Sequence, residues 1–123
     1  MITLRIIGVL YLLSGLWCVA NPDVSSQFLG MTLSQQGLAE FIAVYGGLQV
    51  GIAVAMLGST FNAQFVPGAL YFALLVSAGL FVFRLIGIVL HGAYEGLLMM
   101  AVLEGVFVVA LLKSYLKRRD VSL

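Results

Sequence analysis

Four long apolar stretches alternate with short polar connections along the chain. They cover residues 4–20, 39–57, 66–90 and 93–112. Each is 17 to 25 residues long, and none shows the period-two alternation of a half-buried strand, so we expect helices. About 20 apolar residues suffice to cross the hydrocarbon core of a bilayer. The pattern therefore predicts an all-α fold, a bundle of four transmembrane helices that forms one domain over residues 1–123.

Helix-breaking and polar residues mark the ends of these stretches. Asn21-Pro22-Asp23 predicts a helix stop and a turn after the first stretch. Gly58-Ser59-Thr60 ends the second, and Pro67 lies in the first turn of the third, where a missing N–H costs little. Residues 28–37 form a longer, partly polar connection, which we expect to lie in the membrane interface.

Composition agrees with a membrane location. Hydrophobic residues make up 63% of the 123 residues and charged residues 9%, and the mean hydropathy is +1.16. A soluble domain is nearer one half apolar and one quarter charged, and a water-soluble chain this short could not bury so much apolar surface. The net charge of +1 gives no indication of a nucleic-acid partner. The lipid bilayer is the expected partner, and four spans leave no length for a soluble catalytic domain.

The basic residues predict the orientation. Four of the six lysines and arginines follow the last apolar stretch, Arg5 lies near the start, and the connections at 21–38 and 91–95 contain none. The positive-inside rule then places both termini in the cytoplasm. An alternative is that Arg5, the first apolar stretch and Cys18-Val19-Ala20 form a cleaved signal peptide, which would leave three spans.

A few ionisable residues lie within the apolar stretches, where a charge costs about 3 kcal/mol or more. They are Glu40, Arg84 and Glu104, with Tyr45 and Gln49 as neutral companions. If the last two helices turn near residue 93, Arg84 lies nine residues before the turn and Glu104 eleven after it. Helix rise then brings both to nearly the same depth. We therefore expect an Arg84–Glu104 ion pair.

The remaining polar residues sit at similar depths. Gln49 reaches the level of the expected ion pair, Tyr45 lies one turn shallower on the same face, and Glu40 lies near the outer mouth. The outer half of the membrane thus collects the polar residues, whereas the inner half is almost wholly apolar. This distribution favours a pocket that opens outward, or a structural clasp, over a channel through the membrane.

Small residues recur at every fourth position of the second stretch, at Ala43, Gly47, Gly51 and Ala55. Such a ladder lets two helix backbones approach closely in lipid. We expect it to be a helix-packing face.

His91 and Glu95 have the i, i+4 spacing that can share a proton or a metal ion. The chain has one histidine, however, and Gly92 between the two residues disfavours a continuous helix. We expect a solvated pair and no metal site.

One set of residues resembles a bacterial membrane family. The set consists of Glu40, the Tyr45-Gly46-Gly47-Leu48-Gln49 stretch, the isolated Arg84 with a glycine three residues on, and Glu104. It is similar to the family known as domain of unknown function 4345, and the likeness covers nearly the whole chain. One departure is that Phe41-Ile42 stands where that family commonly has an arginine. The resemblance implies four membrane helices and a bacterial inner membrane, and no activity. The DoxX-like group shares the architecture by analogy only.

These patterns leave three functions open. The first is an interaction or accessory protein, or a homo-oligomer, held by an Arg84–Glu104 clasp. The second is a binding protein or enzyme for a lipophilic molecule such as a quinone, an isoprenoid or a lipid, since arginine suits carboxylate and phosphate groups. The third is a small oligomeric transporter. The spacing shows no nucleophile–base pair, and we expect no cofactor beyond a bound lipid or quinone.

Overall fold

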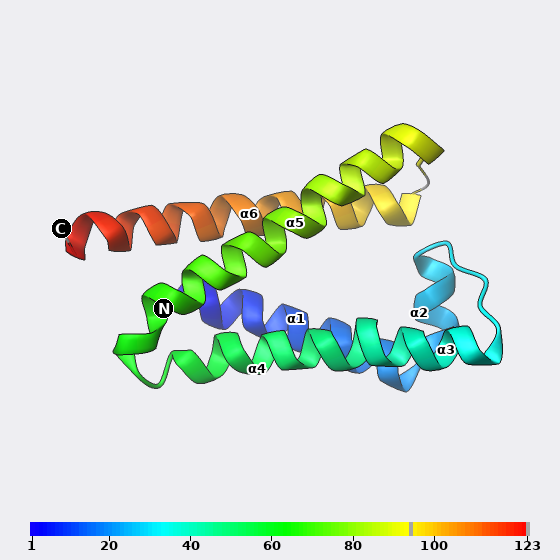
Figure 1. The fold of residues 1–123 in the computed structure, drawn as a ribbon, viewed down its shortest axis with the longest axis horizontal. Coiled ribbons are helices and arrows are strands. Elements are labelled where there is room, and N and C mark those ends of the chain that lie inside the picture. The colour runs from blue at the N-terminus through cyan, green and yellow to red at the C-terminus, as the bar shows by residue number, and fades with distance from the viewer. Residues whose placement is uncertain (94, 123) are drawn as a thin grey trace.

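The computed structural model of the protein describes residues 1–93 and 95–122, and in this part all regular elements are helices, joined by short connections (Figure 1). The side chains of Glu95 and of residues 119–122 are outside that description. Four helices are long and apolar enough to cross a membrane: Ile2–Ala20, Gln35–Ser59, Ala63–His91 and Gly96–Arg118. The predicted all-α fold with four membrane-length helices is confirmed, and it indicates a multi-pass membrane protein.

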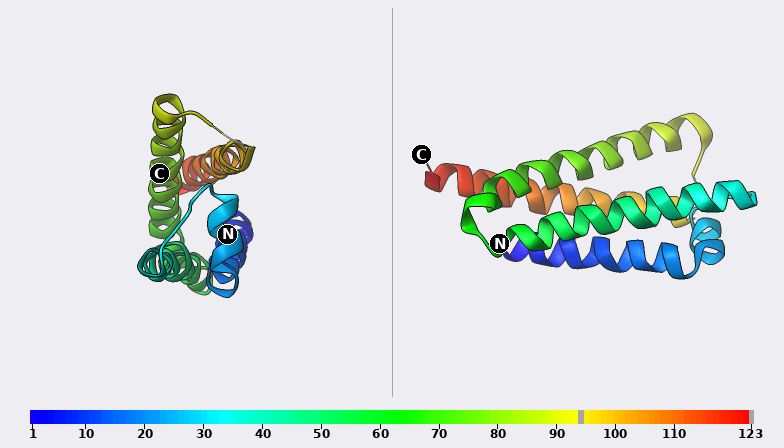
Figure 2. Two further views of the ribbon diagram at one scale, coloured as in Figure 1. Left: turned by 90° about the vertical axis from the view of Figure 1, so that its right-hand side faces the viewer. Right: turned by 60° about the horizontal axis from the view of Figure 1, so that its bottom comes forward.

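The four long helices form two antiparallel hairpins. Helix α1 (Ile2–Ala20) packs along a second helix made of α3 (Gln35–Phe41), η1 (Ile42–Leu48) and α4 (Gln49–Ser59). Helix α5 (Val66–His91), which the short turn η2 (Ala63–Phe65) precedes, packs along α6 (Glu95–Ser122). Both termini and the α4–η2 connection lie at one end of the bundle (Figures 1 and 2). We call this the terminal end, and the other the α2 end.

The connection after the first hairpin helix is more ordered than the sequence indicated. The chain breaks at Asn21 as predicted, and then forms a short helix, α2 (Pro22–Phe28), in place of a simple turn. Pro22 at the first helical position and Asp23 in the first turn are favourable start signals. The second long helix begins at Gln35, four residues before the predicted residue 39, because the Ser34 side chain caps it by accepting a hydrogen bond from the Gly37 N–H.

The last helix also differs from the predicted range of 93–112. Helix α5 ends at His91, because Gly92 adopts a φ of 88°, a left-handed conformation that suits glycine. Helix α6 begins at Glu95 and continues to Ser122. The basic residues after residue 112 end the apolar stretch without ending the helix, because lysine, arginine and leucine are strong helix formers.

Glycines set the close contact within the first hairpin. A Cβ atom at Gly15 would lie 3.0 Å from the Gly46 carbonyl oxygen, and one at Gly46 would overlap the Val19 side chain. Helix α1 and η1 therefore approach closely at Gly15 and Gly46.

The predicted packing ladder of Ala43, Gly47, Gly51 and Ala55 does not pack against another part of the described chain. All four residues are exposed, and a Cβ atom at Gly51 would meet nothing within 4 Å. The face of this helix that meets α1 carries Gly46, and Ala53 joins the buried core, so packing of the ladder stays a prediction.

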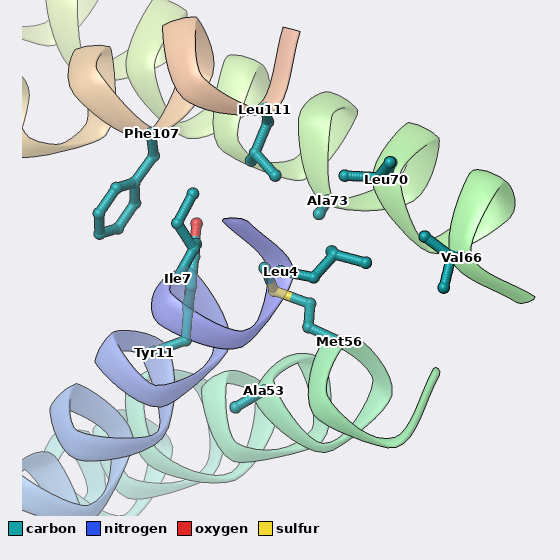
Figure 3. Packing of buried hydrophobic residues seen from close by; sticks show 10 residues of the cluster. All are labelled: Leu4, Ile7, Tyr11, Ala53, Met56, Val66, Leu70, Ala73, Phe107 and Leu111. Atoms are coloured by element: carbon teal, nitrogen blue, oxygen red, sulfur yellow. The ribbon is translucent and has the colours of Figure 1, made fainter. Parts of the chain in front are cut away.

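An apolar cluster fills the terminal end of the bundle (Figure 3). Its side chains converge from α1, α4, α5 and α6 and comprise Leu4, Ile7, Tyr11, Ala53, Met56, Val66, Leu70, Ala73, Phe107 and Leu111. In lipid, such a cluster is held by close packing more than by exclusion of water. It leaves the α2 end as the place where polar side chains gather.

Candidate functional site

A cavity of about 150 Å³ lies between the two hairpins, toward the α2 end of the bundle. All four long helices contribute to its wall, as do Phe28, the last residue of α2, and Leu29 after it. Its polar lining residues are Tyr11, Ser14, Tyr45, Gln49, Arg84 and Glu104. Among the residues predicted to form a polar cluster, the structure thus brings together Tyr45, Gln49, Arg84 and Glu104.

The predicted Arg84–Glu104 ion pair is present and has a two-point geometry. Arg84 Nε donates to Glu104 Oε2 at 2.8 Å, and Nη2 donates to Oε1 at 2.9 Å. The Glu104 side chain is 5% exposed and that of Arg84 17%. Each charge offsets the cost of removing the other from water, and the planar fork of the guanidinium fixes their mutual orientation. The pair also ties α5 to α6 at the cavity wall.

A π-helical turn presents the next two polar residues. Residues Ile42–Leu48 form η1, which interrupts the α-helix. The buried residue Phe41, just before η1, and the buried Gly46 within it are five positions apart. The wider turn rotates the helix face. Tyr45 stacks on Phe41 with ring centroids 4.8 Å apart, and both Tyr45 and Gln49 line the cavity. Such turns often occur at functional sites.

The carboxamide of Gln49 carries an unsatisfied acceptor. Its oxygen, Oε1, is buried and has no hydrogen-bond partner among the described residues. A buried polar atom without a partner costs about 1–3 kcal/mol. Within a native fold, such an atom calls for a specific explanation, and a bound molecule is one.

Two further hydrogen bonds tie the hairpins together, and the sequence analysis missed both. The Tyr11 hydroxyl and Ser77 Oγ lie 3.0 Å apart in a buried contact between α1 and α5. Ser114 Oγ donates to Thr3 Oγ1 at 2.7 Å, between α6 and α1. Ser77 lies seven residues before Arg84 on the same helix stripe, which is the one signal in the sequence that could have drawn attention to it.

Two predicted site residues lie elsewhere. Glu40 and His91 are both exposed, and neither is among the described residues that line the cavity. His91 ends α5 and Glu95 begins α6, so the two residues do not lie on one helix. A shared proton or metal ion at i, i+4 spacing would require a continuous helix. The side chain of Glu95 is outside the described part of the chain, and the described residues form no group of three or more metal-binding side chains.

The terminal end has a different character from the cavity. Burial, together with the charges of Arg118 and Arg5, lowers the pKa of the Met1 amino group. The fold therefore gathers positive charge from both ends of the chain at one end of the bundle, where it can meet anionic lipid head groups.

Comparisons with known proteins give no match to this chain. No family model, curated protein or solved structure matches it.

Proposed function

We propose that this chain is a small protein of the bacterial inner membrane that binds the polar head of a lipophilic molecule in the cavity between its hairpins. The single observation that carries the proposal is the buried, partnerless Oε1 of Gln49 in the wall of a cavity that also holds the Arg84–Glu104 pair. The apolar cluster at the terminal end supports a pocket closed on one side rather than a path through the membrane.

The orientation and the family are parts of the same proposal. The positive charge around Met1, Arg5 and Arg118 supports a cytoplasmic location for both termini. The Tyr45-Gly46-Gly47-Leu48-Gln49 stretch, with Arg84 and Glu104, supports membership of the family known as domain of unknown function 4345. The cavity would then open toward the outer leaflet.

Mass spectrometry of purified protein tests this function. A small molecule should accompany the wild type in mild detergent and be lost from Ser14→Leu, which fills the cavity from α1. Ser59→Leu makes the same change toward the terminal end, outside the cavity lining, and should retain the molecule. If all three proteins carry only the same bulk phospholipid, the proposal is wrong.

A second candidate is an interaction protein or homo-oligomer, and the exposed ladder of Ala43, Gly47, Gly51 and Ala55 favours it. Small residues without an intrachain neighbour suit a close approach by another membrane helix. Gly51→Leu should then abolish self-association measured by cross-linking in membranes. Gly79→Leu is the matched control, because Gly79 is also an exposed helical glycine with nothing within 4 Å of its Cβ position. Equal behaviour of the two variants would exclude this ladder as an interface.

A further inference from the structure

The size of the cavity limits the head group that it can hold. A cavity of about 150 Å³ in an apolar protein core accepts benzene, and this cavity has the same volume. Its apolar wall includes Leu10, Leu80, Met100, Leu103 and Phe107 together with Trp17. A single six-membered ring fits such a space, whereas a phospholipid head group with its glycerol does not.

The polar groups of the wall limit the chemistry of that ring. Two donors of Arg84 are directed at Glu104, and the carboxylate neutralises the guanidinium charge, so the site gives little preference to an anionic head. The partnerless atom is an acceptor, Gln49 Oε1. A rotation about the last torsion of Gln49, which is soft, exchanges the oxygen and nitrogen positions. A hydroxyl group can donate to the oxygen and can also accept from the nitrogen after this rotation, so it pairs with Gln49 in either orientation. A carbonyl or an ether can only accept, so it pairs in one orientation alone.

An apolar groove continues from the cavity along α6. Phe28, Met100 and Leu103 line both spaces. The other groove residues are Leu98, Met99, Val102 and Val106, all of them more than half exposed on the outer surface of the bundle. In a bilayer this surface faces acyl chains. The groove therefore offers a hydrocarbon tail an exit from the cavity that stays within the membrane.

We infer that the cavity takes a phenol-type head: one neutral, hydroxyl-bearing aromatic ring whose hydroxyl donates to Gln49 and whose apolar tail lies in the α6 groove. The inference rests on the proposed binding function and narrows its ligand class. Ring size comes from the cavity volume, the hydroxyl from the partnerless acceptor and the tail from the shared groove residues.

Trp17 provides a direct readout. It is the single tryptophan of the chain and lines the cavity, with its ring edge-on to Phe28 at a centroid distance of 5.8 Å. Binding should change its fluorescence. The probes are para-nonylphenol and its methyl ether, para-nonylanisole, which share ring and tail and differ in the donor. We expect the phenol to bind the detergent-solubilised protein about 10-fold more tightly, because the ether leaves the acceptor unpaired.

Two variants assign that preference to the cavity. Gln49→Leu should bind the phenol and the ether alike, whereas Gln36→Leu, which changes an exposed glutamine in α3, should keep the wild-type preference. Partitioning of the probes into detergent affects the apparent affinity of both variants equally, so a difference between the variants reports on Gln49.

The outcomes separate this inference from the function on which it rests. If the wild type binds both probes with equal affinity, or if the preference persists in Gln49→Leu, the hydroxyl assignment is wrong while the cavity still binds lipophiles. If linear decanol binds as tightly as the phenol, the ring assignment is wrong. If no probe changes Trp17 fluorescence and no molecule accompanies the purified protein, the binding function itself fails.

Discussion

At the scale of single residues, Arg84 and Glu104 illustrate how a membrane helix accommodates charge. Two hydrogen bonds of 2.8 and 2.9 Å join them, and both are largely buried. Such a pair contributes little net stability compared with well-packed apolar residues, yet removing one partner leaves an uncompensated charge. The free energies of unfolding of single and double variants therefore measure how strongly the two residues are coupled in the fold.

Arg84→Leu and Glu104→Leu should each lower the free energy of unfolding by about 3–5 kcal/mol. The double variant should be nearly as stable as the wild type, since it contains no unpaired charge. Unfolding with increasing sodium dodecyl sulfate in mixed micelles measures the three values. A double variant that loses the sum of the two single effects would show that the residues are not coupled.

Tyr11→Phe should lower the free energy of unfolding by about 0.5–1.5 kcal/mol, because it removes the buried hydrogen bond to Ser77 that joins the hairpins. Tyr71→Phe is the control, since Tyr71 is 51% exposed and lies on the surface of α5. The same unfolding assay applies. Equal effects of the two changes would mean that the Tyr11–Ser77 contact does not contribute to stability.

At the scale of elements, the π-helical turn η1 interrupts the second long helix at a point where it packs against α1. The turn places Gly46 against α1 and leaves Gly47 and Gly51 on the outside. It also directs Tyr45 and Gln49 to the cavity wall. The extra residue of the turn rotates the part of the helix before it, so that the buried residues Phe41 and Gly46 lie five positions apart.

Gly15→Ala should lower the free energy of unfolding by about 1–3 kcal/mol, because the new Cβ would press on the Gly46 carbonyl oxygen at 3.0 Å and force the backbones apart. Gly79→Ala, at a position with open space, should be neutral or stabilising by up to about 1 kcal/mol. If Gly15→Ala unfolds at the same detergent concentration as Gly79→Ala, the close approach of α1 and η1 is not required for the fold.

At the scale of the whole molecule, two hairpins enclose a cavity with a few polar side chains in its wall toward one end and an apolar cluster at the other. The termini share the apolar end (Figure 2). Helix α1 supplies Leu4, Ile7 and Tyr11 to the cluster, so it takes part in the fold as a structural helix.

Single cysteines test this topology in a Cys18→Ser background. In bacterial spheroplasts, a membrane-impermeant thiol reagent should label Gln36→Cys, which lies at the α2 end, and should label Asn62→Cys only after permeabilisation. The intact mass of the purified protein should include residues 1–20. Labelling of both positions from outside, or a mass that lacks the first helix, would contradict the proposed orientation.

Much of the fold was predictable because bilayer thickness imposes it. Four apolar stretches of membrane length specify four helices, and helix rise was enough to bring Arg84 level with Glu104, as the structure confirms. Backbone chemistry also explains the boundaries that were missed: Pro22 begins α2, Ser34 caps α3, and Gly92 separates α5 from α6. These local signals were present in the sequence, and they determine where the helices begin and end more closely than the ends of the apolar stretches do.

Other features followed only from the tertiary structure. Spacing shows that Gly47 and Gly51 share a face but not which face meets α1, and in the structure Gly46 makes that contact. The Tyr11–Ser77 bond joins residues 66 positions apart, and no local pattern pairs them. The cavity itself depends on how two hairpins meet, because an empty space is a property of several helices together. The sequence therefore determined which residues lie within the membrane and at what depth, whereas packing between helices determined which of them face one another.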